Sequence, residues 1–350
     1  MKTYFLQVQK IVRETEDTAS LHFWHPISEQ LRYKAGQFLT VLVPGSDGKK
    51  VRRSYSMSSS PATDSSVAIT VKRVKGGLVS NYLCDQVHAG DFLEVIEPMG
   101  RFTYEPEQPH DGNLVMIGAG SGITPLFSIL KTVLKTTDRK ILLIYGNRDE
   151  NSIIFKDALQ QLESAYAGRL NVVYILSRPS GYWVGHHGRI HQANGIWFMK
   201  ENGVDFRKDY FYMCGPEAMM DEMHKIYKLF EVPEVHIFYE RFNAPVQDEE
   251  ELMEKLPDLK KQTVTVQYDG ETHVFDVEPH QTILEAALEL DIDLPYSCQA
   301  GMCTACLGKC LEGKVKMDED EGLTEKEIAE GYVLTCVSRP MSEGVVIEID

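Results

Sequence analysis

The chain has 350 residues, more than one ordinary domain holds, so two or three domains are expected. Hydrophobic residues make up 43% of it, as in typical globular proteins, and no segment is apolar over the length of a membrane span. The formal net charge is −16, and residues 262–350 alone hold nineteen acidic and five basic side chains. Because this acidic end would repel phosphates, the composition argues against nucleic acid as a partner.

The cysteine usage and the first residues indicate the compartment. The N-terminal segment turns polar at Gln7 and lacks the apolar core of a signal peptide. The seven cysteines are an odd number, and four of them follow a cluster-binding spacing that leaves little for a disulfide framework. We therefore expect a cytoplasmic protein without a membrane partner.

Residues 1–106 are expected to form an antiparallel β-barrel. Apolar and polar residues alternate in 38–43, 67–71 and 92–96, which is typical of half-buried strands. Turn residues such as those at 44–48 separate these runs. Short strands joined by tight turns favour a closed barrel.

Two motifs in this barrel have the residue types that bind a flavin. The first supplies a cation for a pyrophosphate, an aromatic face beside the ring and a hydroxyl donor near N5, on alternate sides of one strand: Arg53, Ser54, Tyr55 and Ser56. The second predicts a helix start with exposed amides for the same pyrophosphate: Gly76, Gly77, Leu78, Val79 and Ser80. An ordinary polar strand and a plain turn are the alternative interpretations.

Residues 107–243 are expected to form a parallel α/β domain. After Pro106 and Pro109 the pattern changes to strands that alternate with helical runs. The predicted strands are 114–117, 141–145, 172–176 and 211–213, and the predicted helices are 125–135 and 155–162.

A glycine-rich turn between the first strand and first helix of this domain indicates a nucleotide site. Glycines there let a phosphate approach the backbone at a helix N-terminus: Gly118, Gly120 and Gly122, followed by Thr124 and Pro125. The run departs from the strict dinucleotide fingerprint. A second element, Cys214-Gly215-Pro216, follows a later strand, and a small buried thiol is the alternative interpretation of Cys214.

Arginines after two other strands predict the choice of nucleotide. Arg148 and the pair Ser177-Arg178 can grip a 2′-phosphate, because a guanidinium binds this dianion through two hydrogen bonds. No acidic residue stands where a partner of a ribose 2′-hydroxyl is expected. NADPH is therefore preferred to NADH, and ordinary surface arginines are the alternative.

Residues 244–261 are highly charged and are expected to form a linker, with 262–350 as a β-grasp ferredoxin domain of the α+β class. Asp269-Gly270 predicts a hairpin between 263–266 and 273–275. Thr282 with Glu285 predicts a capping box before an apolar helix, and 345–347 predicts the last strand.

Four cysteines in this domain have the spacing of plant-type [2Fe–2S] ligands. Four, two and twenty-nine residues separate Cys298, Cys303, Cys306 and Cys336. A structural zinc site in a non-catalytic module is the alternative, which the long closing gap disfavours. Cys310 lies outside the pattern and is expected to be a buried strand residue.

In this order, the motifs Arg53–Ser56, Gly76–Ser80, Gly118–Pro125 and Cys214–Pro216 resemble the ferredoxin–NADP reductase superfamily. The resemblance implies that the first two bind FAD and that the Thr-Pro and Cys-Gly-Pro elements line the nicotinamide site. Ser56 and Cys214 are then the catalytic candidates. The family also places an aromatic such as Phe242 near the flavin, where a boundary residue is the alternative. FMN is the alternative cofactor, because related reductases with this domain order use it.

With Tyr296-Ser297-Cys298 and the run from Gly331 to Cys336, the whole chain resembles the reductase subunits of phenylacetyl-CoA epoxidases. Reductases of steroid hydroxylases and dioxygenases share this architecture. The resemblance implies that electrons pass from NADPH through FAD and the [2Fe–2S] cluster to an oxygenase, or to another hydroxylase or general acceptor. The acidity around the cluster predicts that a basic surface of the acceptor docks there, although it can also serve only to keep the domain in solution.

Overall fold

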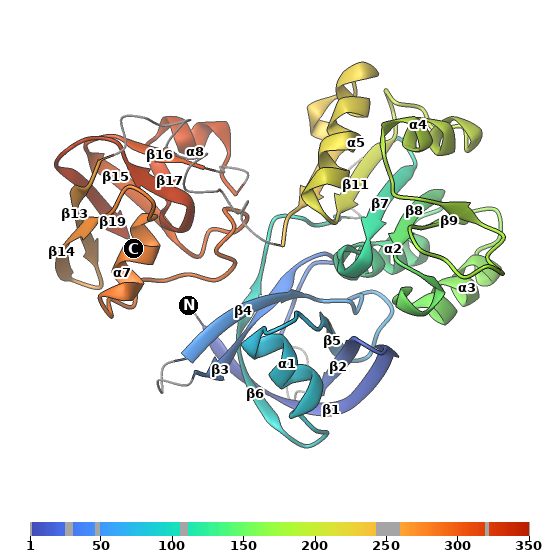
Figure 1. The fold of residues 1–350 in the computed structure, drawn as a ribbon, viewed down its shortest axis with the longest axis horizontal. Coiled ribbons are helices and arrows are strands. Elements are labelled where there is room, and N and C mark those ends of the chain that lie inside the picture. Colours follow the sequence, from blue (N-terminus) through green and yellow to red (C-terminus); the bar gives the residue numbers. More distant parts are fainter. Residues whose placement is uncertain are drawn as a thin grey trace. The chain divides into compact units, whose positions relative to one another are not determined.

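The structure is a computed structural model that describes residues 2–24, 31–45, 50–105, 111–242, 260–318 and 322–349. The chain forms two compact units, Lys2–Arg241 and Phe242–Asp350 (Figure 1). Within the described ranges, no helix is long and apolar enough to cross a membrane.

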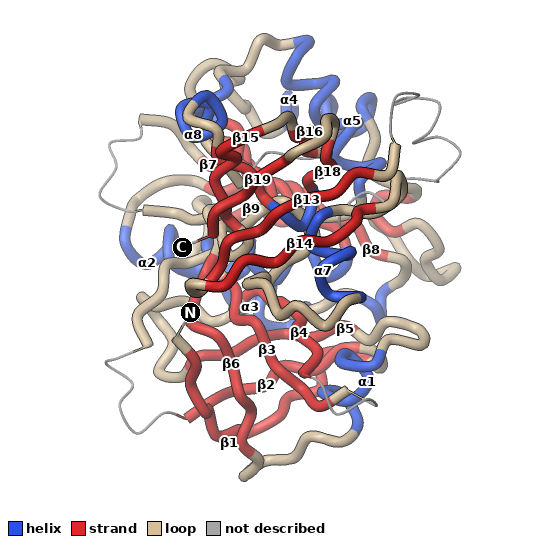
Figure 2. Tube along the Cα trace, turned by 90° about the vertical axis from the view of Figure 1, so that its left-hand side faces the viewer, coloured by secondary structure: helices blue, strands red, loops and turns tan. Residues whose placement is uncertain are grey.

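The first sheet is antiparallel and nearly closes on itself. Its strand order is β4-β3-β6-β1-β2-β5, and a bridge between Met57 and Ile69 links the two edges of the sheet. Leu21 and Leu39 are fully buried in its core. Figure 2 shows how these strands cross one another. The predicted barrel is confirmed, with strands β1 (Thr3–Thr15), β2 (Thr18–Trp24), β3 (Phe38–Pro44), β4 (Lys50–Ser56), β5 (Val67–Lys72) and β6 (Phe92–Met99) and one helix, α1 (Leu78–Asp85).

The three strands predicted from alternation lie in β3, β5 and β6. The turn predicted at 44–48 and the predicted change of pattern at Pro106 and Pro109 fall largely outside the described residues.

The second sheet is parallel, with the order β10-β9-β8-β7-β11-β12. The chain adds β8, β9 and β10 on one side of β7 and then adds β11 and β12 on its other side. Ligands of open α/β sheets bind at the carboxyl ends of the strands beside such a reversal. The strands are β7 (Leu114–Ala119), β8 (Ile141–Asn147), β9 (Leu170–Leu176), β10 (His186–His187), β11 (Tyr210–Cys214) and β12 (Ile237–Glu240).

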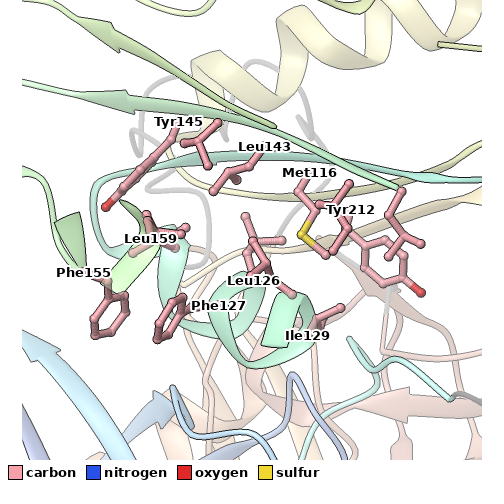
Figure 3. Packing of buried hydrophobic residues seen from close by; sticks show 14 of the residues in the cluster. Met116, Leu126, Phe127, Ile129, Leu143, Tyr145, Phe155, Leu159 and Tyr212 are labelled. Atoms are coloured by element: carbon pink, nitrogen blue, oxygen red, sulfur yellow. The ribbon is translucent and has the colours of Figure 1, made fainter. Parts of the chain in front are cut away.

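Helices cover both faces of this sheet. Helices α2 and α3 share one apolar core with the sheet, and α4 and α5 share the other. Figure 3 shows Leu126 and Ile129 of α2 against Met116 and Leu143 of the sheet. The helices are α2 (Ile123–Thr136), α3 (Lys156–Ala165), α4 (Gln192–Glu201) and α5 (Glu217–Leu229), with short 3₁₀ turns η1 (Gly120–Gly122), η2 (Glu150–Ser152) and η3 (Glu234–His236).

The C-terminal unit holds a five-stranded mixed sheet with the order β14-β13-β19-β15-β17. Helix α7 packs its buried Ile283 and Leu284 into the core. The predicted β-grasp arrangement is confirmed, whereas the predicted linker at 244–261 lies almost wholly outside the described residues. The elements are β13 (Gln262–Tyr268), β14 (Glu271–Val277), α7 (Ile283–Glu289), β15 (Leu307–Glu312), β16 (Val315–Met317), α8 (Glu325–Ala329), β17 (Tyr332–Leu334), η4 (Thr335–Val337), β18 (Ser338–Pro340) and β19 (Val345–Ile349).

Candidate functional site

The end of the barrel strand β4 meets the carboxyl edge of the parallel sheet. The Ser56 hydroxyl donates a hydrogen bond to Glu240 Oε2 at 3.2 Å, and both residues are buried. Cys214 is fully buried, and its thiol pKa lies well above the usual value because of burial and the negative charge of Glu240. The structure therefore brings together the two predicted catalytic residues and one carboxylate that the sequence did not indicate.

Strand pairing explains how these residues meet. Cys214 ends β11 and pairs with Glu240 at the end of β12. On the other side, Cys214 pairs with Gly118 near the end of β7. All three positions lie at the strand ends where the direction of strand addition reverses, which is the expected ligand crevice.

The glycine turn is shaped for close approach of the backbone. A Cβ on Gly122 would lie 2.0 Å from the Cys214 carbonyl oxygen, so a side chain cannot fit there without a backbone shift. Gly120 has a φ of 54°, in the left-handed region that favours glycine. The first turn of α2 is uncharged, and the Thr124 hydroxyl, just before Pro125, donates to the Ser121 carbonyl at 2.9 Å. The helix N-terminus, with its positive dipole end, therefore suits a phosphate.

The predicted flavin strand is β4. Its side chains alternate, so Arg53 and Tyr55 lie on one side of the strand and Ser54 and Ser56 on the other. Tyr55 packs against the barrel core, and burial raises the pKa of its hydroxyl above the usual value. Ser54 Oγ lies 3.1 Å from Thr40 Oγ1. A neutral aromatic, an exposed guanidinium and hydroxyls on one strand fit a flavin.

The second predicted flavin motif is the start of α1. Gly76 has a φ of 74°, and Gly77 is the residue before the first helical turn. The Ser80 Oγ accepts a hydrogen bond from the Val74 amide at 3.1 Å, which holds the turn in place. Leu78 is exposed and Val79 is buried. The first turn carries no acidic side chain, so its amides can donate hydrogen bonds to an anionic group.

The loops after β8 and β9 lie side by side, as the predicted 2′-phosphate site requires. The Ser177 amide donates to the Asn147 carbonyl at 3.0 Å, and the Arg178 amide donates to the Arg148 carbonyl at 2.7 Å. Arg178 is exposed. The Arg148 guanidinium, however, lies 3.6 Å from an Asp149 oxygen, a carboxylate that the sequence prediction did not weigh.

Two further charged side chains near the glycine turn were not predicted. Lys72 Nζ, at the end of β5, lies 3.8 Å from the position of a Cβ on Gly120. It also lies 3.7 Å from Asp17 Oδ2 in the turn between β1 and β2. Asp17 Oδ2 is in turn 3.8 Å from Arg148 Nη2. No pattern in the sequence relates a barrel turn to these nucleotide-domain loops.

In the C-terminal unit, the four predicted cluster cysteines converge. Cys303 and Cys306 are almost fully buried, Cys336 is buried and Cys298 is half-buried. The Sγ atoms of Cys306 and Cys336 are 3.3 Å apart, and the Ala300 amide donates to Cys298 Sγ at 3.4 Å. Gln299 and Gly301 both have positive φ, which turns the loop back on itself. Four sulfurs and an amide donor on a tight loop fit an iron–sulfur cluster.

Three of these thiols shift one another's pKa values. Hydrogen bonds from Cys303 and Cys336 lower the pKa of Cys298 far below the usual value, and hydrogen bonds to Cys298 raise the pKa of its two partners. Among the described residues, no three His, Cys, Asp or Glu side chains are grouped to hold a metal ion. A [2Fe–2S] cluster instead divides four cysteines between two irons.

Two other expectations concern residues outside these clusters. Phe242 is 41% exposed and lies just beyond β12, so its predicted place beside the flavin stays a prediction. Cys310 lies in β15 as expected, but it is half-buried rather than buried, and its Sγ donates to the Glu312 carbonyl at 3.3 Å.

Three protein families match successive parts of the chain. An oxidoreductase FAD-binding domain matches residues 6–104, an oxidoreductase NAD-binding domain matches residues 116–225, and a 2Fe-2S iron-sulfur cluster binding domain matches residues 266–341. The last match places the four cysteines in a cluster-binding domain and speaks against the zinc alternative.

Whole-chain relatives identify the family. The ferredoxin reductase component of 3-ketosteroid-9-alpha-monooxygenase from Rhodococcus rhodochrous is 36% identical over 354 residues, covering 99% of this chain and 97% of the relative. A component of the 1,2-phenylacetyl-CoA epoxidase of Escherichia coli is also 36% identical, over 350 residues with the same coverage. The chain belongs to the family of oxygenase reductase components.

Solved structures show the same fold as this reductase component. Phthalate dioxygenase reductase has a TM-score of 0.62 at 23% identity, covering 99% of this chain and 98% of that one. An intact type IV self-sufficient cytochrome P450 monooxygenase has a TM-score of 0.72 at 21% identity, and the match spans 99% of this chain and 41% of that longer one. The predicted three-domain architecture and the prediction of an NAD(P)H-dependent oxidoreductase acting through FAD and [2Fe–2S] domains are confirmed.

Proposed function

We propose that this reductase component oxidises NADPH where β4 meets the parallel sheet and delivers single electrons to an oxygenase. Bound FAD would supply the step from a two-electron hydride donor to single electrons, which the [2Fe–2S] cluster would carry one at a time. The hydrogen bond between Ser56 and Glu240 carries the proposal, because it joins the flavin strand to the nucleotide crevice.

Each residue at this junction has a proposed task. Glu240 Oε2 accepts a hydrogen bond from the Ser56 hydroxyl and thereby fixes its orientation. Cys214 stays a neutral thiol because burial and Glu240 raise its pKa, so it adds no negative charge beside the proposed nicotinamide site. The absence of a side chain on Gly122 keeps the neighbouring backbone close to Cys214. The proposed domain limits are 1–106, 107–243 and 262–350, with a linker at 244–261.

The nucleotide is proposed to be NADPH rather than NADH. Hydrogen bonds between the loops bring Arg148, Ser177 and Arg178 to one place at the carboxyl ends of β8 and β9. A 2′-phosphate carries two negative charges and can accept hydrogen bonds from both guanidinium groups.

The test is the ratio of kcat/KM for NADPH and NADH in Arg148→Ala and Arg178→Ala. Loss of a charge-assisted hydrogen bond should lower kcat/KM for NADPH by about 10-fold to 100-fold and leave NADH nearly unchanged. Arg207→Ala is the matched control, because Arg207 is an exposed arginine of the same domain that pairs with Glu231. An unchanged ratio in both variants would show that NADPH is not selected in this way.

We propose that a basic surface of the electron acceptor docks against the acidic C-terminal domain of this protein. The Gly322 amide donates to the Gly301 carbonyl at 2.7 Å, which holds the segment before α8 against the cluster loop. The first turn of α8 carries Glu325 and Glu327. Opposite charges speed encounters and lose their effect in salt, so Glu325→Lys should slow reduction of the acceptor at low salt more than at high salt.

A phenylacetyl-CoA epoxidase-type oxygenase is the proposed client, and a steroid monooxygenase or another hydroxylase is the second candidate. The equal identity to the two relatives supports both. Mixing the purified protein with each oxygenase component and measuring NADPH-dependent product formation distinguishes them. A colourless preparation without flavin would contradict the whole proposal. A cytoplasmic location belongs to the same proposal and rests on the cysteine pattern.

A further inference from the structure

Asp17 is fixed in the turn between β1 and β2. The hydroxyls of Thr15 and Thr18 donate to its Oδ1 at 2.8 and 3.0 Å. The Arg73 amide donates to the Asp17 carbonyl at 2.7 Å. One carboxylate oxygen is therefore held by the turn, and the other, Oδ2, faces two cations.

These two cations belong to different parts of the nucleotide site. Lys72 is 3.7 Å from Asp17 Oδ2 and lies over Gly120 at the start of η1, where a pyrophosphate is proposed to bind. Arg148 is 3.8 Å from the same oxygen and adjoins Ser177 and Arg178, where a 2′-phosphate is proposed to bind. One carboxylate oxygen thus lies between both phosphate positions.

The strengths of these contacts suit an exchange of partners. Both ion pairs are long and partly exposed, and such pairs contribute little to stability. Phosphate oxygens form shorter and stronger hydrogen bonds with lysine and arginine. Burial raises the pKa of Asp17, but the Thr15 hydrogen bond and the Lys72 charge outweigh it and leave the pKa below its usual value. The carboxylate is therefore charged near neutral pH.

We infer that Asp17 is a specificity-determining counter-ion, which holds Lys72 and Arg148 in the nucleotide-free protein and yields them to the phosphates of NADPH. The inference rests on the proposed function, since it uses the proposed phosphate positions. The energy of the two ion pairs is subtracted from the binding energy of the nucleotide. Asp17 therefore limits the affinity for NADP⁺ and favours its release.

The test is the Kd of NADP⁺ and of NAD⁺, measured from the flavin absorbance of the oxidised protein without turnover. In Asp17→Asn the amide oxygen keeps both threonine hydrogen bonds, and the charge is lost. The Kd of NADP⁺ should decrease about 2-fold to 10-fold. The Kd of NAD⁺ should decrease less, because NAD⁺ has no 2′-phosphate for Arg148 and benefits only from the release of Lys72. When Asp17→Asn is combined with Arg148→Ala, it should lower the Kd of NADP⁺ only as much as it lowers the Kd of NAD⁺.

Asp149→Asn is the comparison variant that releases Arg148 alone. Asp149 lies 3.6 Å from Arg148 Nε and accepts hydrogen bonds from the Asn151 and Ser152 amides, which asparagine can also accept. This variant should lower the Kd of NADP⁺ and leave the Kd of NAD⁺ unchanged.

Two results would overturn the inference. Unchanged or weaker NADP⁺ binding by Asp17→Asn, in a variant with wild-type thermal stability, would show that Asp17 does not compete for the cations. If neither Arg148→Ala nor Arg178→Ala changed the ratio of the two Kd values, the proposed 2′-phosphate site itself would fail. The first result overturns the counter-ion alone and leaves the proposed function intact.

Discussion

Ser56 and Glu240 form a hydrogen bond of 3.2 Å although 184 positions separate them in the sequence. Ser56 ends a strand of the barrel, and Glu240 ends the last strand of the parallel sheet. Both side chains are buried, so the bond is shielded from water and couples the two domains at the proposed reaction site.

Ser56→Ala should slow hydride transfer from NADPH by about 10²-fold, because it removes the hydroxyl that Glu240 holds at the proposed reaction site. Glu240→Gln should have a smaller effect of the same sign, because the glutamine side-chain oxygen can still accept the hydrogen bond from Ser56. Stopped-flow measurement of flavin reduction at saturating NADPH reports this step. The double variant should be no slower than Ser56→Ala, since both changes act on one contact. Independent, multiplicative effects would contradict the assigned coupling.

Gly122→Ala should destabilise the N-terminal unit by about 1–3 kcal/mol, the usual effect of overpacking. The new Cβ would lie 2.0 Å from the Cys214 carbonyl oxygen, and backbone atoms cannot swing aside as a side chain can. Thermal unfolding measures the loss of stability, and the KM for NADPH measures whether the shifted turn still binds the nucleotide. Gly181→Ala is the control, because nothing lies within 4 Å of its added carbon. Equal unfolding temperatures for the two variants would show that the turn is more adaptable than its geometry indicates.

Cys303→Ser should leave NADPH-driven reduction of a small dye by the flavin largely intact and abolish single-electron delivery to a protein acceptor. Serine lacks the soft thiolate that binds iron. Dye turnover, cytochrome c reduction and the visible spectrum report the separate steps. Cys310→Ser should keep the cluster spectrum, because the Cys310 Sγ donates to the Glu312 carbonyl and is outside the ligand set. Undiminished cytochrome c reduction by Cys303→Ser would contradict the proposed route.

His22 should make the fold less stable as the pH falls. Burial, together with the positive charge of Lys10, lowers its pKa to about 4, whereas a histidine in the unfolded chain titrates near its ordinary pKa of 6.5. Between these values the unfolded chain binds more protons, so the free energy of unfolding decreases as the pH drops through this window. The raised pKa of Glu14 acts in the opposite direction, but Glu14 is present in both wild type and His22→Gln, so it does not affect their comparison. Urea midpoints measured from about pH 7 to about pH 5 should fall less in His22→Gln than in wild type. Parallel decreases would contradict this assignment.

Local signals in the sequence were sufficient to predict the helices and strands and the cysteines of the cluster. Asp269 and Gly270 adopt the two positive φ values that the predicted hairpin turn requires. Thr282 and Glu285 form the predicted capping box. Such features depend on residues a few positions apart, and the spacing of the four cysteines is itself fixed by the cluster.

Other parts of the site could not be predicted, because they depend on contacts between distant segments. Asp17 is a single charged residue in a turn, and Lys72 and Glu240 are single charged residues at strand ends. Nothing nearby in the sequence distinguishes them from solvated side chains. Their surroundings arise when a barrel turn meets the loops of the parallel sheet. A buried carboxylate at a strand end becomes informative when the partner across the domain junction is known.

The position of β19 has a consequence for biosynthesis. This strand, Val345–Ile349, lies in the middle of its sheet between β13 and β15, yet it is made more than seventy residues after β13. Until the ribosome has passed Ile349, β13 has an unpaired edge that can associate with other chains. The sheet that supports all four cysteines therefore cannot close during synthesis of the cysteine loop. The closed sheet is therefore available to a cluster only after this domain has been translated, when the FAD-binding and NAD-binding part has long been available to fold.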